Sequence, residues 1–182
     1  NLMLNKRIAI IGAGPAGLMA AEVLSQYDYD IEVYEQKPSA ARKFLMAGKT
    51  GLNISHAEPV EMFIQRYDHA AWLGPWIKQC DAVWIQHWMQ GLGIESYIGS
   101  SGRVFPVEMK AAPLLRAWLK RLMNDGVKFH YRHRCVALSG NQLTLENQTQ
   151  TFTKSYDAII LACGAVSWPQ LGSDGGWQHW LS

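Results

Sequence analysis

The stretch Arg7-Ile-Ala-Ile-Ile-Gly12-Ala-Gly14-Pro-Ala-Gly17 decides how this 182-residue chain begins to fold. The run from Arg7 to Ile11 is short, apolar and β-branched, which predicts a strand buried on both faces. Helical spacing follows over Pro15 to Gln26, where proline suits the first turn because it has no N–H to leave unpaired. A second strand is predicted over Asp30 to Glu35. This order indicates a βαβ unit, whose two strands are parallel.

The glycines of this stretch fit the pattern G-x-G-x-x-G, and each has a mechanical reason. Gly12 permits a tight turn, Gly14 lets the backbone approach a pyrophosphate, and Gly17 lets helix and strand pack closely. The N-terminus of the helix offers free N–H groups to the anion. Glu35 follows 21 residues after Gly14, where a carboxylate accepts hydrogen bonds from a ribose and repels the 2′-phosphate of NADP. The pattern alone also fits an ordinary turn, and Glu35 an ordinary strand end, but together they predict dinucleotide binding.

The rest of the chain interrupts this beginning. Residues 36–59 predict a long irregular connection, which is usually functional. A helical block follows over 60–93, with Trp72 and Trp76 on one face and Trp84 and Trp88 on another. Core packing or a cover over the sheet is the favoured interpretation of these aromatic pairs, and a substrate-facing cluster is the alternative. Part of this Trp-rich surface is expected to be exposed. Later segments predict short strands in 94–107, an amphipathic helix over 110–125, an antiparallel meander built from 128–131, 135–138, 142–145 and 151–153, and a buried strand over 156–163.

This interrupted order favours FAD over NAD, because a plain dehydrogenase continues with parallel strands at short intervals. It is similar to the FAD domain of the two-dinucleotide-binding-domain flavoproteins, which have the glutathione-reductase-like fold. In that fold the strand before the flavin ends in an Ala-Thr-Gly-like turn, and Ala162-Cys163-Gly164 matches with a cysteine in the threonine place. The expected fold class is α/β: a Rossmann-like FAD-binding domain with a parallel sheet, a small antiparallel β-meander and a helical Trp-rich block.

Three further motifs narrow the resemblance, which covers essentially the whole chain. They are Arg42-Lys-Phe-Leu-Met-Ala-Gly-Lys-Thr-Gly-Leu-Asn53, Gly99-Ser-Ser-Gly-Arg-Val-Phe-Pro106, and Gly164-Ala-Val-Ser-Trp-Pro169 followed by Gly172-Ser-Asp-Gly175. In this order they resemble the bacterial flavoprotein family often labelled NAD(FAD)-utilising dehydrogenases, which includes aminoacetone oxidase and a bile-acid oxo-steroid dehydrogenase. Members of the family are roughly twice as long as this chain. Residues 1–182 would therefore be the N-terminal part of an FAD/NAD(P)-binding domain, without the inserted substrate domain and the returning C-terminal segment. Alone, such a fragment is expected to bind FAD weakly or not at all.

The resemblance also implies roles for individual residues. The FAD pyrophosphate would be held by Gly12, Gly14, Ala16 and Gly17, the ribose by Glu35, and the ribose and phosphates by Arg42 and Lys43. Gly51 and Asn53 would run beside the flavin, Val136 would offer backbone hydrogen bonds to adenine, and Gly164 would let the chain turn past the cofactor. Ser167, Trp168, Ser173 and Asp174 match the loop after the last strand, without a catalytic role. Arg42 and Lys43 taken alone would be two surface bases.

Composition excludes several other classes of protein. The 17 Lys and Arg residues against 15 Asp and Glu give a formal charge of +2, which is no basis for binding nucleic acid. No apolar run is long enough to cross a bilayer, and the N-terminus is unlike a signal peptide, so a cytoplasmic location is expected. Cys80, Cys135 and Cys163 are widely spaced and predict reduced, buried thiols, without a metal site. None of the histidines suggests a ligand set, although His56, just after Asn53, is the one nearest the flavin loop.

The leading hypothesis is therefore an FAD-dependent oxidoreductase acting on a small-molecule substrate, with NAD(P)H as a possible electron donor. An NAD-dependent dehydrogenase is the first alternative, and a non-catalytic dinucleotide-binding sensor module is the second. The sequence assigns no catalytic acid or base, no particular substrate and no oligomeric state.

Overall fold

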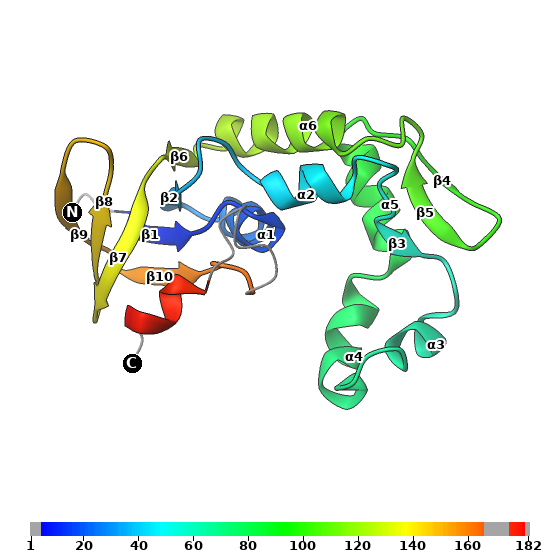
Figure 1. The fold of residues 1–182 in the computed structure, drawn as a ribbon. Coiled ribbons are helices and arrows are strands. Elements are labelled where there is room, and N and C mark those ends of the chain that lie inside the picture. The colour runs from blue at the N-terminus through cyan, green and yellow to red at the C-terminus, as the bar shows by residue number, and fades with distance from the viewer. Residues whose placement is uncertain (1–4, 166–174, 181–182) are drawn as a thin grey trace. The chain divides into compact units, whose positions relative to one another are not determined.

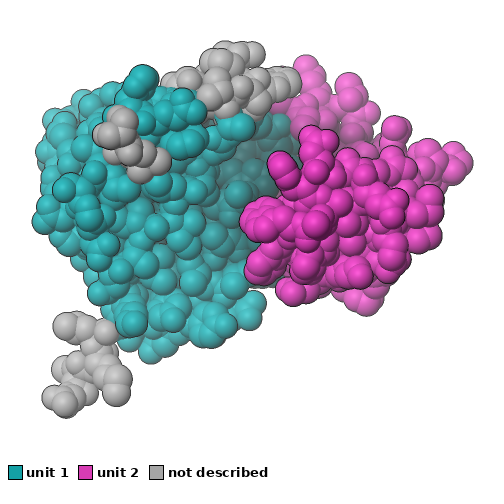
Figure 2. All heavy atoms as spheres, turned by 90° about the horizontal axis from the view of Figure 1, so that it is seen from below, with its two compact units in different colours: residues 1–44, 119–182 teal, residues 45–118 magenta. Residues whose placement is uncertain are grey.

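The computed structural model describes residues 5–165 and 175–180. Two compact units divide the chain: unit 1 comprises Asn1–Phe44 and Leu119–Ser182, and unit 2 comprises Leu45–Trp118 (Figure 2). Four residues singled out in the sequence, Ser167, Trp168, Ser173 and Asp174, lie outside the described residues. Among the described helices, none combines the length and the hydropathy that crossing a membrane would require.

A four-stranded parallel sheet, here called sheet A, forms the centre of unit 1 (Figure 1). Its strands are β1 (Lys6–Ile11), β2 (Tyr29–Glu35), β6 (Lys128–Tyr131) and β10 (Ala158–Leu161), in the order β10-β1-β2-β6. Helix α1 (Pro15–Leu24) connects β1 to β2. The predicted βαβ unit is thus confirmed, and Ile8 to Ile11 of β1 are buried as a central strand requires.

The predicted meander is confirmed for three of its four strands. Strands β7 (Arg134–Ser139), β8 (Gln142–Glu146) and β9 (Thr151–Ser155) form an antiparallel sheet, here called sheet C. The assignment of 128–131 to the meander was wrong, because β6 pairs in parallel with β2 at the edge of sheet A. The preceding helix α6 (Ala111–Asn124) explains this difference, since a strand that follows a helical crossover joins its sheet in the parallel direction. Gly126, with φ +89°, ends that connection.

Sheets A and C share one apolar core. Ala9 and Ile11 of β1 and Tyr34 of β2 pack with Leu143 and Leu145 of β8, all of them buried. Cys135 and Tyr156 complete the cluster, and Phe152 and Ile159 pack against it. This apolar layer holds the meander on the carboxyl half of the parallel sheet.

Unit 2 is built from short helices and a small antiparallel sheet. Its helices are α3 (Val60–Ile64), α4 (Ala70–Gln79) and α5 (Ala82–Gly91), and its sheet has the order β3-β5-β4, with β3 (Ser55–His56), β4 (Ser96–Ile98) and β5 (Arg103–Pro106). Helix α2 (Arg42–Ala47) and helix α6 both cross a boundary between the units. The first of these lies inside the segment 36–59, which was predicted to be irregular.

The tryptophans of the helical block divide into two groups. Trp84 and Trp88 of α5 stack with ring centroids 6.3 Å apart, and Trp88 meets Trp118 edge-on at 4.8 Å. Trp72 and Trp76 of α4 instead expose 70% and 60% of their surface. The α5 pair is therefore half-buried and packs against another aromatic ring, as predicted. The α4 pair is not packed in a core; it forms the exposed part that was expected of this surface.

We expect Gly17→Ala to destabilise unit 1 while Gly14→Ala leaves its stability unchanged. A Cβ at Gly17 would lie 1.9 Å from the carbonyl oxygen of Gly12, whereas a Cβ at Gly14 would meet nothing within 4 Å, and φ at Gly14 is −79°. Forcing the first contact costs about 2 kcal/mol or more, because backbone must move. Urea unfolding followed by circular dichroism measures both free energies. Equal values for the two variants would contradict this account of the turn.

Candidate functional site: a cavity at the carboxyl edge of sheet A

The glycine-rich turn forms the first wall of the site. The N–H of Gly12 donates to the carbonyl oxygen of Tyr34 at 2.8 Å, which joins the end of β1 to the end of β2. Gly12 has φ +106°, and a Cβ there would lie 2.3 Å from the carbonyl oxygen of Ala162, beyond β10. Gly12 and Gly17 are therefore glycines because the protein's own backbone occupies the space of a side chain.

Gly14 differs from its two neighbours in the motif. It lines a cavity, its φ is ordinary for any residue, and no protein atom fills the space where its Cβ would stand. It is the N-cap of α1, and the first helical hydrogen bond runs from the Leu18 N–H to the Gly14 carbonyl at 2.9 Å. The amides of Ala16 and Gly17 thus precede the helical ladder and face an approaching anion with the positive end of the helix.

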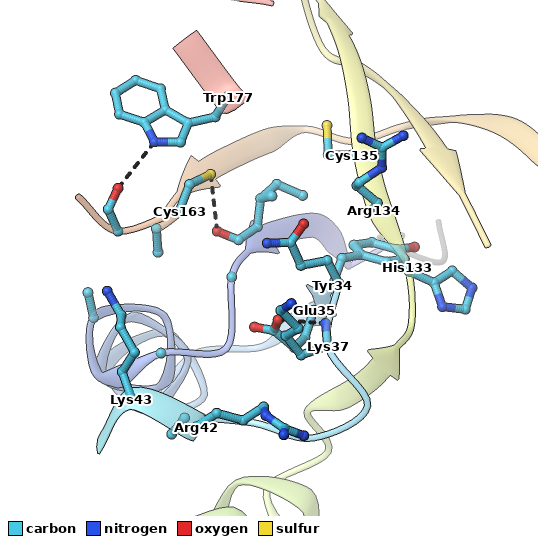
Figure 3. A pocket seen from close by; sticks show the side chains of 18 of the residues that line it. Tyr34, Glu35, Lys37, Arg42, Lys43, His133, Arg134, Cys135, Cys163 and Trp177 are labelled. Atoms are coloured by element: carbon cyan, nitrogen blue, oxygen red, sulfur yellow. Dashed lines mark hydrogen bonds between the residues drawn. The ribbon is translucent and has the colours of Figure 1, made fainter. Parts of the chain in front are cut away.

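Glu35 stands at the end of β2 with its carboxylate fixed by two backbone amides. The N–H of Ala13 donates to Oε2 at 2.9 Å, and the N–H of Lys37 donates to Oε1 at 2.8 Å. A carboxylate has about four acceptor positions, so each oxygen keeps capacity for a further donor. Glu35 is thereby held as an oriented acceptor at the rim of the cavity (Figure 3).

Two cations and a hydroxyl form the neighbouring part of the rim. Arg42 and Lys43 begin helix α2 and line the cavity, and the Arg42 guanidinium donates to Ser39 Oγ at 3.5 Å. Figure 3 shows both side chains extending from α2 beside the cavity. Ala41, just before them, has φ +51° and donates its N–H to the Ala13 carbonyl at 2.8 Å. This bond ties the cationic segment to the glycine-rich turn.

Strand β7 of sheet C forms the opposite wall. Its ladder with β8 pairs Cys135 with Leu145 and then Ala137 with Thr144, so the register between these described residues skips Val136. Such a bulge takes a residue's backbone out of the ladder. Val136 lines the cavity, and its amide and carbonyl are therefore suited to the edge of a planar base.

The end of β10 closes the third side. Gly164 has φ +75°, and its carbonyl accepts a hydrogen bond from the indole Nε1–H of Trp177 at 3.1 Å. Trp177 belongs to the 3-10 helix η2 (Gly176–Trp180). The thiol of Cys163 approaches the Ile11 carbonyl at 3.8 Å and also borders the cavity (Figure 3).

The cavity enclosed by these walls has a volume of about 460 Å³ and is lined by residues of unit 1. It brings together eight of the predicted site residues, namely Gly12, Gly14, Ala16, Glu35, Arg42, Lys43, Val136 and Gly164. Gly17 supports the turn from behind. Gly51 and Asn53 belong to unit 2 and are not among the described residues that line this cavity. Their loop has its own bond, from the Asn53 N–H to the Gly51 carbonyl at 3.1 Å.

Several lining residues escaped the sequence reasoning. They are Tyr34, Lys37, Ser39, His133, Arg134, Cys135 and Trp177. Some of them have a signal in hindsight: Lys37 and Ser39 lie between the assigned Glu35 and Arg42, and Arg134 and Cys135 immediately precede Val136. Trp177 stands two residues after Gly175, which ends the last glycine motif. Cys163, which the resemblance places in the turn before the flavin, also lines the cavity.

His56 has a structural role in unit 2. Its Nε2 lies 2.9 Å from the Ser101 carbonyl oxygen and so acts as a donor, while Nδ1 accepts the Glu58 N–H at 3.2 Å. Its ring fills the space beside Gly102, where a Cβ would lie 2.8 Å away. Both ring nitrogens of His56 thus have partners within unit 2.

The two thiols at the cavity are protonated at neutral pH. Burial raises the pKa of Cys163 to about 11, and the charges of Cys135 and Glu35 add to the shift. Burial likewise raises the pKa of Cys135 to about 11, against a smaller opposing effect of its bond to the Ala137 carbonyl. Neither is an activated nucleophile. The three cysteines are free, but only Cys135 is buried as predicted; Cys163 is half-buried and Cys80 is exposed, so the prediction of a buried thiol was wrong for Cys80 and only partly met for Cys163.

A family model described as the HI0933-like protein Rossmann domain matches residues 6–182. The chain belongs to this family. The HI0933-like chain is 28% identical over 173 residues to a 3-dehydro-bile acid delta(4,6)-reductase of Clostridium scindens. This aligned region covers 93% of the chain and 41% of the reductase. It therefore spans about two fifths of the length of that relative.

Solved structures confirm the fold of the HI0933-like chain. A 3-ketosteroid-delta4-(5alpha)-dehydrogenase from Rhodococcus jostii RHA1 matches with a TM-score of 0.67 and 13% identity, covering 91% of this chain and 47% of the other. An open conformation of a flavocytochrome c3 fumarate reductase matches with a TM-score of 0.68 and 16% identity. The match covers 90% of this chain and 34% of the reductase. The predicted Rossmann-like fold class is thus confirmed.

The thiols of Cys135 and Cys163 lower the unfolding free energy of the chain as the pH rises through the alkaline range. Their pKa values are about 11 in the folded chain against 9.0 for the ordinary group, so unfolded thiols ionise first as the pH rises. Their contribution is fully present below pH 9 and is lost between about pH 9 and 11. We expect the urea-unfolding free energy to fall less steeply over this window in a Cys135→Ala, Cys163→Ala double variant. Cys80→Ala is the matched control and should follow the unmodified chain; a double variant that falls equally steeply would contradict the assignment.

Proposed function

We propose that this chain is the dinucleotide-binding part of an FAD-dependent oxidoreductase. The single observation that carries the proposal is Gly14, a glycine that neither its φ nor any protein neighbour requires, at the edge of a cavity beside an uncapped helix N-terminus. A bound pyrophosphate would occupy the space left open there. The cavity volume of about 460 Å³ lies within the usual range for a ligand site.

The donors and acceptors around the cavity fit the adenosine diphosphate half of FAD. In the proposed complex the pyrophosphate lies against Gly12, Gly14 and the amide of Ala16, and Arg42 and Lys43 offset its charge. Glu35, already oriented by two amides, accepts hydrogen bonds from the ribose hydroxyls. The backbone of Val136 binds adenine at the bulge in β7.

Residues near the end of β10 would accompany the rest of the cofactor. Gly164, with φ +75°, lets the chain turn sharply past it. Gly51 and Asn53 of unit 2 remain proposed contacts of the flavin, where glycine allows a close approach and the amide both donates and accepts. FAD itself supplies the electron chemistry, and the protein supplies binding and orientation.

The wider assignment is also a proposal. We infer a small-molecule substrate, NAD(P)H as electron donor, and a bacterial cytoplasmic location, which three free cysteines suit. Residues 1–182 would be the N-terminal part of the FAD-binding domain, with the substrate domain and the returning segment outside it. The reductase relative, of which this chain spans 41%, supports that division.

An NAD-dependent dehydrogenase is the alternative enzyme. It predicts a run of βαβ units, whereas here unit 2 separates β2 from β6 and sheet C separates β6 from β10. A non-catalytic sensor module is the other alternative, and it predicts binding without turnover in the intact flavoprotein. The interrupted order favours FAD.

We expect the chain to bind ADP and FAD with similar, weak affinity, at a Kd of about 10 µM to 1 mM, and to leave FMN unbound. The adenosine half would carry the contacts on this chain, which is why the flavin adds little. Ligand-observed NMR and calorimetry measure these values. Tight NADH binding with no FAD binding would favour the dehydrogenase, and the absence of binding by every adenine ligand would overturn the proposal.

Gly14→Ala should weaken ADP and FAD binding about tenfold or more, because its methyl group enters the space proposed for the pyrophosphate. Its unfolding free energy should match that of the unmodified chain, since the Cβ meets no protein atom. Gly93→Ala in unit 2, also in open space although at φ +75°, serves as a control that leaves ADP affinity unchanged. Unaltered ADP binding in Gly14→Ala would remove the main support for a pyrophosphate at this turn.

A further inference from the structure

A buried hydrogen-bonded cluster lies behind the cavity and is used by none of the proposed cofactor contacts. Its centre is Glu32 of β2, which is 7% exposed. Tyr156 donates to Glu32 Oε2 at 2.7 Å, and His130 of β6 donates to Oε1 at 2.9 Å. Arg7 of β1 approaches Oε2 at 3.3 Å. Burial alone would raise the pKa of Glu32, but these hydrogen bonds and the charge of Lys154 lower it overall, so the carboxylate is ionised.

The hydrogen bonds around Glu32 have a defined direction. Because the Tyr156 hydroxyl gives its proton to Glu32, the Tyr34 hydroxyl must donate to the Tyr156 oxygen. Tyr34 in turn accepts from Lys154 Nζ at 3.3 Å. A single chain of donors therefore runs from Lys154 through Tyr34 and Tyr156 to the carboxylate, and each hydroxyl both donates and accepts.

This chain of hydrogen bonds joins the two sheets that form the walls of the cavity. Glu32 and Tyr34 belong to sheet A, Lys154 belongs to β9 of sheet C, and Tyr156 follows β9 directly. Two further polar contacts join the same sheets: the Arg7 guanidinium donates to the Ser155 carbonyl at 3.3 Å, and Lys154 Nζ lies 3.7 Å from Glu32 Oε1. The contacts of the core cluster between the sheets are apolar. Apolar contacts are non-directional, whereas buried hydrogen bonds demand one arrangement of their partners.

Tyr34 also connects the cluster to the site itself. Its carbonyl accepts the Gly12 N–H at 2.8 Å, and its ring stacks on His130 at a centroid distance of 4.7 Å. The next residue, Glu35, accepts the His133 N–H through its carbonyl at 3.0 Å, just before β7 begins. The glycine-rich wall and the β7 wall thus meet at the strand that carries the cluster.

We propose that Tyr156, with Glu32, is a positioning residue of the adenosine site: the donor chain from Lys154 to Glu32 fixes sheet C on sheet A and thereby sets Val136 opposite the glycine-rich turn. This inference rests on the proposed function, because it assumes that a dinucleotide spans the two walls. Neither residue touches the ligand; both act through the spacing of the walls.

The base of the ligand provides a test that separates positioning from stability. ADP and inosine diphosphate share the ribose and the pyrophosphate, but they present opposite donor and acceptor patterns at the base position next to the backbone of Val136. We expect the unmodified chain to prefer ADP by about tenfold, the worth of roughly one hydrogen bond to a correctly placed partner. If β7 stays in place, the ratio of ADP to inosine diphosphate affinity is preserved. If β7 shifts, the ratio falls.

Tyr156→Phe is the first variant to measure. It keeps the ring in the apolar core and removes the hydroxyl that links Tyr34 to Glu32. We expect the ADP preference to fall below threefold, while inosine diphosphate binding changes less than twofold. Tyr27→Phe removes a hydroxyl from a side chain that is 59% exposed and serves as the matched control, with an unchanged ratio.

Lys154→Met is the second variant. Lys154 is 37% exposed at the outer end of the donor chain, so its replacement should leave the chain folded even if Tyr156→Phe does not fold. It should reduce the ADP preference, and Lys154→Arg should restore it. A folded Tyr156→Phe or Lys154→Met chain with an unchanged ratio overturns the inference, as does equal binding of the two nucleotides by the unmodified chain. Failure of the unmodified chain to bind either nucleotide would instead count against the proposed function.

Discussion

The close approach of three backbone segments is the constraint on which the rest of unit 1 depends. Gly12 leaves β1 so near to the Ala162 carbonyl, and so near to Gly17 of α1, that no side chain fits between them. Without this contact the helix could not begin directly at the end of the strand. Because it does, the N-terminus of α1, the end of β2 and the end of β10 reach one edge of sheet A. The chemistry of the site follows from that meeting, since each segment supplies a different group: amides, a carboxylate and a sharp turn.

Local sequence patterns predicted most helices and strands correctly, but they did not predict which strand or surface some of these elements pack against. The βαβ beginning, the amphipathic helix before Gly126 and the turns of the meander are encoded in spacing and in glycine positions, which a sequence displays directly. Strand β6 resembles the meander strands in length and composition, and only its pairing with β2, almost 100 residues earlier, distinguishes it. Trp72 and Trp76 illustrate a related limit: helical spacing identifies a common face, but it does not identify what covers that face.

The site was predictable to the extent that its residues lie in motifs. Gly14, Glu35 and Val136 were assigned in advance and line the cavity. Trp177 and His133 were not, because a side chain that reaches a cavity from another element leaves no periodic trace in the sequence. The sequence also does not show why each position of the motif is glycine. Backbone atoms leave no room for a side chain at Gly12 and Gly17, whereas Gly14 opens toward the cavity, and only the structure distinguishes the two cases.

The position of β1 in sheet A has a consequence for the order in which the chain folds during synthesis. Its neighbour on one side, β2, emerges from the ribosome soon after it, but its neighbour on the other side, β10, is made about 150 residues later. Until then one edge of β1, whose residues Ile8 to Ile11 are apolar, has no partner, and the turn at Gly12 lacks the carbonyl against which it packs. Pairings so distant in sequence form slowly. This edge of sheet A therefore stays unpaired until β10 is made, and exposed strand edges favour misassembly.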